Sequence, residues 1–424
     1  MAATLLKSAE LWTMGESNQY LESGDVLVAD GVIRQIGPRG TLTVSQDVHT
    51  IDLSGLILLP GLINCHTHLS LTNLKGLGNN LSLFPWLQQM GAAIAHQDSG
   101  DVNVATRAGL SELLRSGVTC LCDCGPNGPG VVAALGTERG LRTVSGLMVR
   151  SSWFGRSVAG NLAGDIAATE ELLTYWSQRS GLPSFFLGAH SLYTASPDLL
   201  RNAKRASRTL GLDFNLHLAE CAEETEYIRQ QYGVSPVVHA ERLGLLDEFT
   251  IVNHCVDITS DEMGLLADRG VRVVHCPASN AKLGSGTARV VEMRERGLLV
   301  GLGTDSAASN DDLNMFQEMR MAVLLQRAYY CDPSRFSALD ALRMSTIDAA
   351  RVLGMSDRIG SIEIGKLADL IAVETCLPVR QRGVTGLDAL IFAADSTRVR
   401  MVMVDGKLLL DDVRSGGTGL VQAG

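Results

Sequence analysis

The sequence predicts an α/β fold in which a (β/α)₈ TIM-type barrel is joined by a small β-sandwich domain formed by both chain termini. In the middle of the chain, short apolar runs with strand character alternate with longer amphipathic runs, as expected of a parallel barrel. The two ends instead carry strand patterns separated by tight turns. The 424 residues are enough for a barrel of roughly 250 residues and a smaller unit.

Hairpin signals mark both ends of the chain. In residues 25–38 (DVLVADGVIRQIGP), two β-rich runs flank Asp30-Gly31, a dipeptide favoured in two-residue turns. Residues 399–410 (VRMVMVDGKLLL) repeat this pattern around Asp405-Gly406. We therefore assign residues 1–58 and 359–424 to the β-sandwich domain and residues 59–358 to the barrel.

Eight barrel strands are predicted between these ends. The first ends at His66–His68, and the others cover residues 117–123, 142–149, 184–190, 212–218, 250–255, 271–276 and 298–305. Helical patterns such as residues 101–116 and 312–330 lie between or after them, and residues 307–355 supply the last helices. The glycine-rich stretch 125–130 (GPNGPG) is predicted to be a loop and does not match a phosphate-binding P-loop.

Composition excludes several classes of protein. The formal net charge is −10 and the basic residues are scattered, which argues against nucleic-acid binding. No apolar run approaches the roughly 18 residues of a membrane span. Glu10 and Glu16 come too early for a signal peptide. Nine cysteines without paired spacing favour a reducing cytoplasm over a disulfide framework.

Imidazole and carboxylate side chains gather where the predicted strands end, which is where barrel enzymes carry their chemistry. These residues are His66, His68, His190, His217, His254, His275 and Asp305. His66 and His68 are two apart in a strand, so both rings leave the same face. Three imidazoles and a carboxylate suit one divalent zinc or iron ion. We assign the ligands to His66, His68, His217 and Asp305.

Hydrolysis also requires a group that takes a proton from water and delivers it to the leaving atom. Glu220, three residues after His217, is placed for that role, although a carboxylate of a helix N-terminus is the alternative. His254 could stabilise a developing oxyanion or be a core histidine, and Asp305 could share the water proton. His275 is as compatible with bracing its loop as with chemistry.

These stretches resemble the amidohydrolase superfamily, and most of all its branch of cytosine-deaminase-like enzymes, S-adenosylhomocysteine/methylthioadenosine deaminases and triazine hydrolases (chlorohydrolases). The matching segments, in the order expected of the family between residues 55 and 373, are LPGLINCHTHLSLTNLKGLGNNLSLFPWLQ, LGAHSLYTAS, LHLAE, VNHCVDIT, VVHCPASNAKLGSG, GLGTDSAASNDDLNMF and IGSIEIGKLADLIAV. The resemblance implies a metal-dependent hydrolase that attacks a ring carbon bearing an amino or similar leaving group. It also implies a homo-oligomer.

The resemblance extends to individual residues. It implies that the metal ligands are His66, His68, His217 and Asp305. It also implies that Glu220 is the proton shuttle with His254 as its partner, and that Trp86 and His190 contact the substrate. Related barrels with two metals are bridged by a lysine at the end of strand four. This chain has His190 there, and Lys75 and Lys282 follow strands one and seven, so one ion, zinc or alternatively iron, is expected.

One departure bears on the substrate. Adenosine-type members carry a WPxE-like segment after the tryptophan-leucine pair, and its glutamate binds ribose hydroxyls. This chain reads WLQQMGAAIAHQDSGD, without that glutamate. The departure favours a free base, pterin or triazine over a nucleoside, unless a carboxylate comes from elsewhere. Arg150 and Arg156 could meet an anionic substrate group or be solvated loop residues.

The predicted function is therefore the hydrolytic deamination of an amino-substituted nitrogen heterocycle, a small-molecule substrate. The alternatives are an S-adenosylhomocysteine/5′-methylthioadenosine deaminase, or a chlorohydrolase or N-alkylamine hydrolase acting on a triazine. A non-catalytic scaffold is disfavoured because the expected ligands and the acid–base residue are all present. A serine hydrolase is disfavoured because the sequence has no GxSxG elbow.

Overall fold

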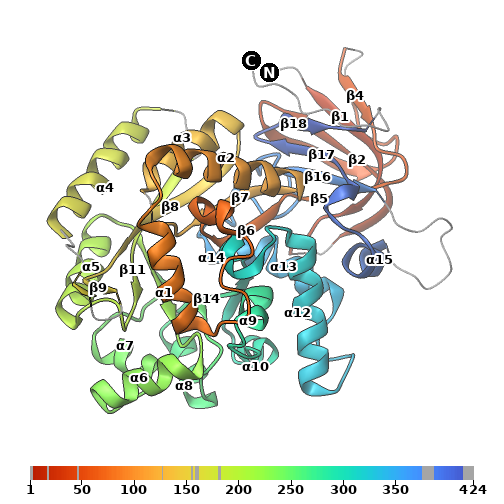
Figure 1. The fold of residues 1–424 in the computed structure, drawn as a ribbon. Helices are drawn as coiled ribbons and strands as arrows, with labels where there is room; N and C mark the ends of the chain where they lie inside the picture. The colour runs from red at the N-terminus through yellow and green to blue at the C-terminus, as the bar shows by residue number, and fades with distance from the viewer. Residues whose placement is uncertain are drawn as a thin grey trace.

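The computed structural model describes residues 3–16, 19–44, 47–126, 128–153, 156–157, 162–179, 183–374 and 386–413. Figure 1 shows a barrel with its surrounding helices and, at the upper right, a separate sheet that contains the first and the last strands of the chain. Among the described residues, no helix has the length and apolar character needed to cross a bilayer.

The barrel sheet has eight parallel strands in sequential order. They are β6 (Leu62–Thr67), β7 (Val118–Asp123), β8 (Arg142–Val149), β11 (Pro183–Ser191), β12 (Asp213–Leu218), β13 (Thr250–His254), β14 (Arg272–His275) and β15 (Leu299–Leu302). A bridge between Thr67 and Asp305 joins the first strand to the segment after the last one. The Asp305 N–H also donates to the His66 carbonyl at 3.0 Å. The predicted barrel is confirmed, and its ring is nearly closed at the carboxyl ends of the strands.

Helices cover the outside of the barrel and connect its strands (Figure 1). They are α1 (Leu83–Ile94), α2 (Ser99–Arg115), α3 (Pro129–Arg139), α4 (Leu162–Ser177), α5 (Pro197–Thr209), α6 (Ala222–Tyr232), α7 (Pro236–Arg242), α8 (Ser260–Asp268), α9 (Pro277–Lys282), α10 (Val290–Glu295), α11 (Ala307–Asn310), α12 (Met315–Tyr330), α13 (Ala338–Met344) and α14 (Ile347–Val352). The sequence indicates where two of these helices begin: Asp98 is the N-cap of α2 and Thr259 is the N-cap of α8, each in a capping box. The predicted loop 125–130 is shorter than expected, because Pro129 already begins α3.

The chain ends form one mixed sheet, which confirms the predicted small β domain. Its strands are β1 (Thr4–Trp12), β2 (Tyr20–Ala29), β3 (Val32–Pro38), β4 (His49–Asp52), β5 (Leu56–Pro60), β16 (Leu370–Glu374), β17 (Val399–Val404) and β18 (Lys407–Asp411). Their apolar side chains share one buried core. Both predicted hairpin turns have positive φ at the two turn residues, 52° and 77° at Asp30-Gly31 and 49° and 72° at Asp405-Gly406, as a type I′ turn requires. The remaining described elements are β9 (Ser152–Trp153), β10 (Arg156–Ser157), α15 (Gly386–Ala393), η1 (Leu69–Leu74) and η2 (Ser396–Arg398).

A buried ion pair joins the barrel to this terminal sheet. Arg142, the first residue of β8, donates to both carboxylate oxygens of Asp369 at 3.0 and 3.2 Å and to Asp405 at 3.0 Å. Asp369 precedes β16 and Asp405 lies in the turn after β17. This contact lies at the amino ends of the barrel strands, opposite the end that carries the clustered histidines. The domain limits after residues 58 and 358 stay a prediction.

Candidate metal centre and substrate pocket

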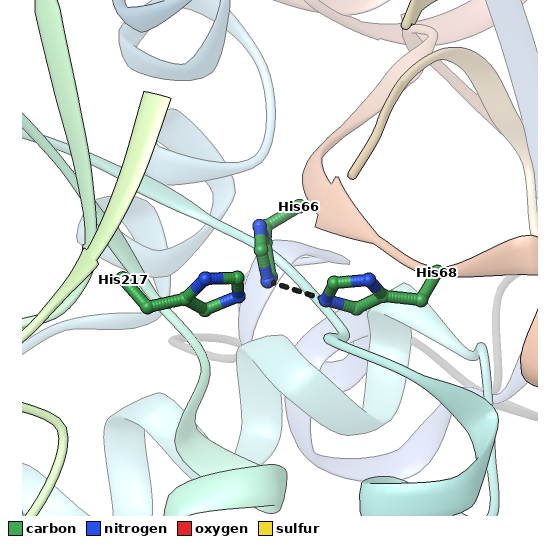
Figure 2. Close-up of side chains that lie close together, drawn as sticks. All are labelled: His66, His68 and His217. Atoms are coloured by element: carbon green, nitrogen blue, oxygen red, sulfur yellow. Dashed lines mark hydrogen bonds between the residues drawn. The ribbon is translucent and has the colours of Figure 1, made fainter. Parts of the chain in front are cut away.

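The carboxyl ends of the barrel strands bring the predicted metal ligands together. His66 and His68 come from β6 and its end, and His217 comes from β12. Figure 2 shows their three imidazole rings pointing toward a common point. Asp305 follows β15 and completes the group, which we call the four-residue cage (His66, His68, His217 and Asp305). All four side chains are buried.

The spacing of the donor atoms of His66, His68 and Asp305 fits one metal ion, and the nearest ring nitrogen of His217 lies within 4.8 Å of those of His66 and His68. His66 Nε2 and His68 Nε2 are 3.1 Å apart (Figure 2). Asp305 Oδ1 lies 3.2 Å from His68 Nε2 and 3.4 Å from His66 Nε2. Donors that bind a tetrahedral zinc ion at 2.0–2.1 Å are separated from one another by about 3.3 Å. Three nitrogens and a carboxylate oxygen are also the donors that zinc and iron accept.

Surrounding groups orient the cage. His217 Nδ1 is 2.7 Å from the carbonyl oxygen of His190, to which it can only donate, so its Nε2 is left as the donor atom for an ion. Asp305 Oδ2 accepts hydrogen bonds from Ser279 Oγ at 2.6 Å and Ser309 Oγ at 2.9 Å. These two hydroxyls leave Oδ1 directed at the histidines. Burial alone would raise the pKa of Asp305, but its hydrogen bonds to His66 and His68 hold that pKa well below its usual range.

The backbone is strained where functional side chains leave the strands. Ala219, His254 and Asp305 have φ values of 51°, 75° and 57°, in the left-handed region that favours glycine. Such conformations cost on the order of 1–3 kcal/mol each and persist only where the surroundings enforce them. The turn at Ala219 sets the direction of the next residue, Glu220. These positions coincide with the ends of β12, β13 and the segment after β15.

Glu220 lies beside the cage in a buried position. Its backbone N–H donates to Glu224 Oε2 at 2.8 Å, and its own Oε2 is 3.7 Å from His254 Nε2. Burial, followed by the charge of Asp305, raises the pKa of Glu220 well above its usual range. Burial likewise raises the pKa of Glu224 to about 8. Glu220 is therefore a carboxyl group that can hold a proton under conditions where an exposed glutamate is ionised.

Asn280 orients His254. Its Oδ1 is 2.9 Å from His254 Nδ1, and because an amide oxygen only accepts, Nδ1 carries the hydrogen and Nε2 faces Glu220 as an acceptor. Burial lowers the pKa of His254, which favours the neutral ring. His254 also belongs to a second possible metal-binding group, with His66 and Asp305. This group shares two residues with the cage, so the two groups describe one centre.

A cavity of about 220 Å³ opens over the cage. The residues predicted to contact substrate that line it are Trp86, Arg150 and His190. Trp86 is buried, in α1. Arg150 follows β8, and burial lowers the pKa of its guanidinium.

Two candidates remain, Arg156 and His275. Arg156 begins the short strand β10, but its side chain lies outside the described part of the chain. His275 ends β14, is buried and does not line the cavity. Burial lowers its pKa to about 3, and within the described residues neither ring nitrogen has a hydrogen-bond partner.

Other residues at the site were not predicted from the sequence. Ser279, Asn280, Ser309 and Glu224 orient the cage or Glu220 and His254 through the hydrogen bonds described above. Trp153 and Asp165 line the cavity, from β9 and α4. The only sequence signal for Ser279 and Asn280 was their position in the segment HCPASN, directly after a predicted strand.

Comparisons with known proteins agree with this architecture. The model of the amidohydrolase family matches residues 57–409. A 5-methylthioadenosine/S-adenosylhomocysteine deaminase from Syntrophobacter fumaroxidans is 35% identical over 415 residues, 97% of this chain and 94% of the relative. The chain therefore belongs to the amidohydrolase family and is a hydrolase whose strand-end histidines and aspartate form a divalent-metal site.

Two solved structures share the complete fold. An adenosine deaminase from Xanthomonas campestris with bound zinc superimposes with a TM-score of 0.91 at 32% identity, covering 100% of this chain and 95% of that one. An atrazine chlorohydrolase from Arthrobacter aurescens TC1, in complex with zinc, has a TM-score of 0.89 at 23% identity, with 98% and 97% coverage. At 23% identity, the similarity to the chlorohydrolase is evidence for a shared fold and not for a shared activity.

Proposed function

We propose that this protein is a metal-dependent hydrolytic deaminase of an amino-substituted nitrogen heterocycle. The observation that carries the proposal is the position of Glu220: a buried carboxyl group of raised pKa, next to the four-residue cage and facing the cavity. Deamination requires both a site that activates water and a group that moves a proton from that water to the departing amino group. The two similar proteins reported above that exceed 30% identity are both deaminases, which supports this reaction.

The cage would hold one divalent ion, and zinc is proposed because it is bound in the related adenosine deaminase. When bound, such an ion supplies Lewis-acid activation of water. One ion is proposed because His190 stands at the end of β11. The two lysines near the strand ends point to other partners, with Lys75 2.7 Å from Glu112 and Lys282 2.6 Å from Asp311.

The residues around the cage would divide the proton chemistry. Glu220 takes the proton of the attacking water and delivers it to the amino group, which leaves as ammonia. His254 is held by Asn280 with Nε2 toward Glu220, so it can accept a hydrogen bond from the attacking water and from the hydroxyl group that this water adds to the ring carbon. Asp305, a proposed ligand through Oδ1, has Oδ2 saturated by Ser279 and Ser309, which fixes its orientation. Trp86 and His190 line the part of the cavity that the substrate ring would occupy.

The first candidate substrate is an adenosine-type compound. Curated relatives of nearly the same length are 5-methylthioadenosine/S-adenosylhomocysteine deaminases, and one from Desulforudis audaxviator is 37% identical over 395 residues, 92% of this chain and 89% of the relative. The carboxylate that the sequence lacks in α1 could be replaced by Asp165, which lines the cavity from α4. Burial raises the pKa of Asp165, as expected of a carboxyl group facing a pocket.

A free base, pterin or triazine is the second candidate. Ile94 lines the cavity from the end of α1, in the segment where adenosine-type relatives were expected to carry a glutamate. An apolar side chain offers nothing to ribose hydroxyls. A triazine substrate would also allow chloride or an alkylamine as the leaving group.

Ammonia release by the metal-loaded protein tests the proposal across adenine, guanine, cytosine, 8-oxoguanine, isoxanthopterin, melamine, adenosine, methylthioadenosine and S-adenosylhomocysteine. Fast turnover of a nucleoside compound supports the first candidate, and turnover confined to bare rings supports the second. Chloride or amine release from substituted triazines, with no ammonia from the panel, would replace the deaminase by another hydrolase. A cytoplasmic location and a homo-oligomeric state remain part of this proposal.

A further inference from the structure

Trp153 occupies the outer wall of the cavity, beyond the residues assigned above. It ends the two-residue strand β9, and its ring lies edge-to-face with the ring of His190, with centroids 5.1 Å apart and planes at 69°. The Arg150 guanidinium lies over the indole, 5.2 Å from its centroid, at a distance typical of a cation–π contact. Both Trp153 and Arg150 line the cavity. Two neighbours from different segments therefore hold this indole at the pocket.

A glycine in α1 makes room for the indole. A Cβ atom on Gly91 would lie 2.2 Å from Trp153 Nε1 and 2.9 Å from Cδ1, closer than real Cβ contacts allow. Gly91 is within a helix and has no positive φ, so its backbone does not require glycine. A glycine inside a helix costs about 1 kcal/mol relative to alanine. Its presence is explained by the space that the indole of Trp153 occupies.

Aromatic rings line one wall of the pocket from the cage outward. The His217 ring of the cage is 4.9 Å from the His190 ring, and the Trp153 ring is the next along the wall. A heterocycle whose reacting carbon lies at the cage and Glu220 would pass His190. Any substituent on the far side of that heterocycle would then reach Trp153.

Resting on the proposed deaminase function, we propose that Trp153, seated against Gly91, is a specificity-determining residue that selects heterocycles carrying a substituent on the side away from the amino group. The indole offers this substituent a large apolar surface that is already ordered by His190 and Arg150, so little conformational entropy is lost on binding. A bare ring bound at the cage does not extend to Trp153. The residue therefore distinguishes a substituted purine from the free base.

Ligand binding without turnover provides the test. Metal-loaded protein carrying Glu220→Gln, in which turnover is expected to be strongly slowed, is titrated calorimetrically with adenine and with 5′-methylthioadenosine, which share the reacting ring. Adding Trp153→Ala is expected to weaken methylthioadenosine binding by about 10- to 100-fold, the range for lost apolar pocket contacts. Adenine binding is expected to stay within about twofold.

Gly91→Ala supplies the matched variant. Its methyl group displaces the indole, so it should weaken methylthioadenosine binding in the same direction as Trp153→Ala. Combining both substitutions should be no worse than Trp153→Ala alone, because Gly91 acts only through the indole. Unchanged metal content in every variant shows that the cage is intact.

The proposal is overturned if Trp153→Ala weakens both ligands equally, if it weakens neither, or if the two substitutions are additive. Failure of methylthioadenosine to bind the Glu220→Gln protein also overturns it. Failure of the proposed function is seen separately, as an absence of ammonia release by protein that retains Glu220.

Discussion

Ser279→Ala should weaken metal binding although it changes none of the four proposed ligands. Asp305 Oδ2 accepts two hydrogen bonds, from Ser279 at 2.6 Å and from Ser309 at 2.9 Å, and all three residues are buried. Removing one hydroxyl leaves the carboxylate with a single partner on that oxygen. The side chain can then rotate, so Oδ1 is no longer held toward His66 and His68.

The size of the effect follows from the lost contact. A hydrogen bond to a charged group contributes about 1.5–3 kcal/mol, which corresponds to roughly 10- to 100-fold in a binding constant. Loss of an outer partner of a metal ligand typically costs the same 10- to 100-fold in metal affinity. We expect a decrease in this range for Ser279→Ala. Because both hydroxyls serve one oxygen, Ser279→Ala with Ser309→Ala should cost more than the sum of the single changes.

Competition with a chelating indicator measures the affinity for zinc. Ser145→Ala is the matched control, since Ser145 is also a buried serine of the barrel domain, but it lies within β8 and its hydroxyl donates to the Pro129 carbonyl at 3.1 Å. This control should bind zinc as tightly as the unaltered chain. If Ser279→Ala bound zinc as tightly as Ser145→Ala, the hydroxyl would not orient Asp305 and the reasoning would be refuted.

Three further outcomes are expected. Glu220→Gln should lower kcat by about 10²- to 10⁴-fold with stoichiometric metal retained, because it removes the proposed proton shuttle; near-normal ammonia release would contradict that role. Arg142→Met should lower the free energy of unfolding in urea by about 3–5 kcal/mol, because it leaves Asp369 buried and unpaired; a loss below about 1 kcal/mol, typical of an exposed pair, would contradict this. Burial would raise the pKa of Asp247, but its hydrogen bond to Lys204 at 2.6 Å and one to Arg208 lower it. A lowered folded pKa gives stability that is present above the unfolded value of about 3.9 and is lost as the pH falls. Asp247→Asn should therefore reduce the loss of unfolding free energy between pH 5 and pH 3, measured by urea titration at each pH. An equal loss in Asp247→Asn and in the unaltered chain would contradict the pairing.

The barrel and the cage could be predicted because both depend on local sequence patterns. A strand of alternating or continuous apolar residues is visible within a few positions, and the side chains that end parallel strands share one edge of the sheet. All eight predicted barrel strands coincide with observed ones: the seven with two predicted limits agree to within a few residues, and β6, for which only the end was predicted, ends at Thr67 between His66 and His68. The same rule placed His217, His254 and Asp305 on that edge without any knowledge of their distances.

The orienting residues could not be predicted, because their role depends on closure of the ring. Ser279 and Asn280 are adjacent in sequence and look like ordinary polar residues at a helix start. Only when β13, β14 and β15 lie side by side does Ser279 reach Asp305 while Asn280 reaches His254. Small polar side chains have many possible partners, and their sequence neighbours do not identify which one they contact.

The segment after Trp86 shows how an absent residue can have a structural cause. From the sequence, GAAIA indicated only the loss of a carboxylate that could bind ribose. In the structure, Gly91 admits the indole of Trp153, from a strand 62 positions later in the chain, and Ile94 adds an apolar surface beside it. The same substitutions that remove a polar contact from α1 thus create space for an aromatic one. Substrate selection in this pocket therefore depends on the pairing of α1 with β9, and neither segment indicates it alone.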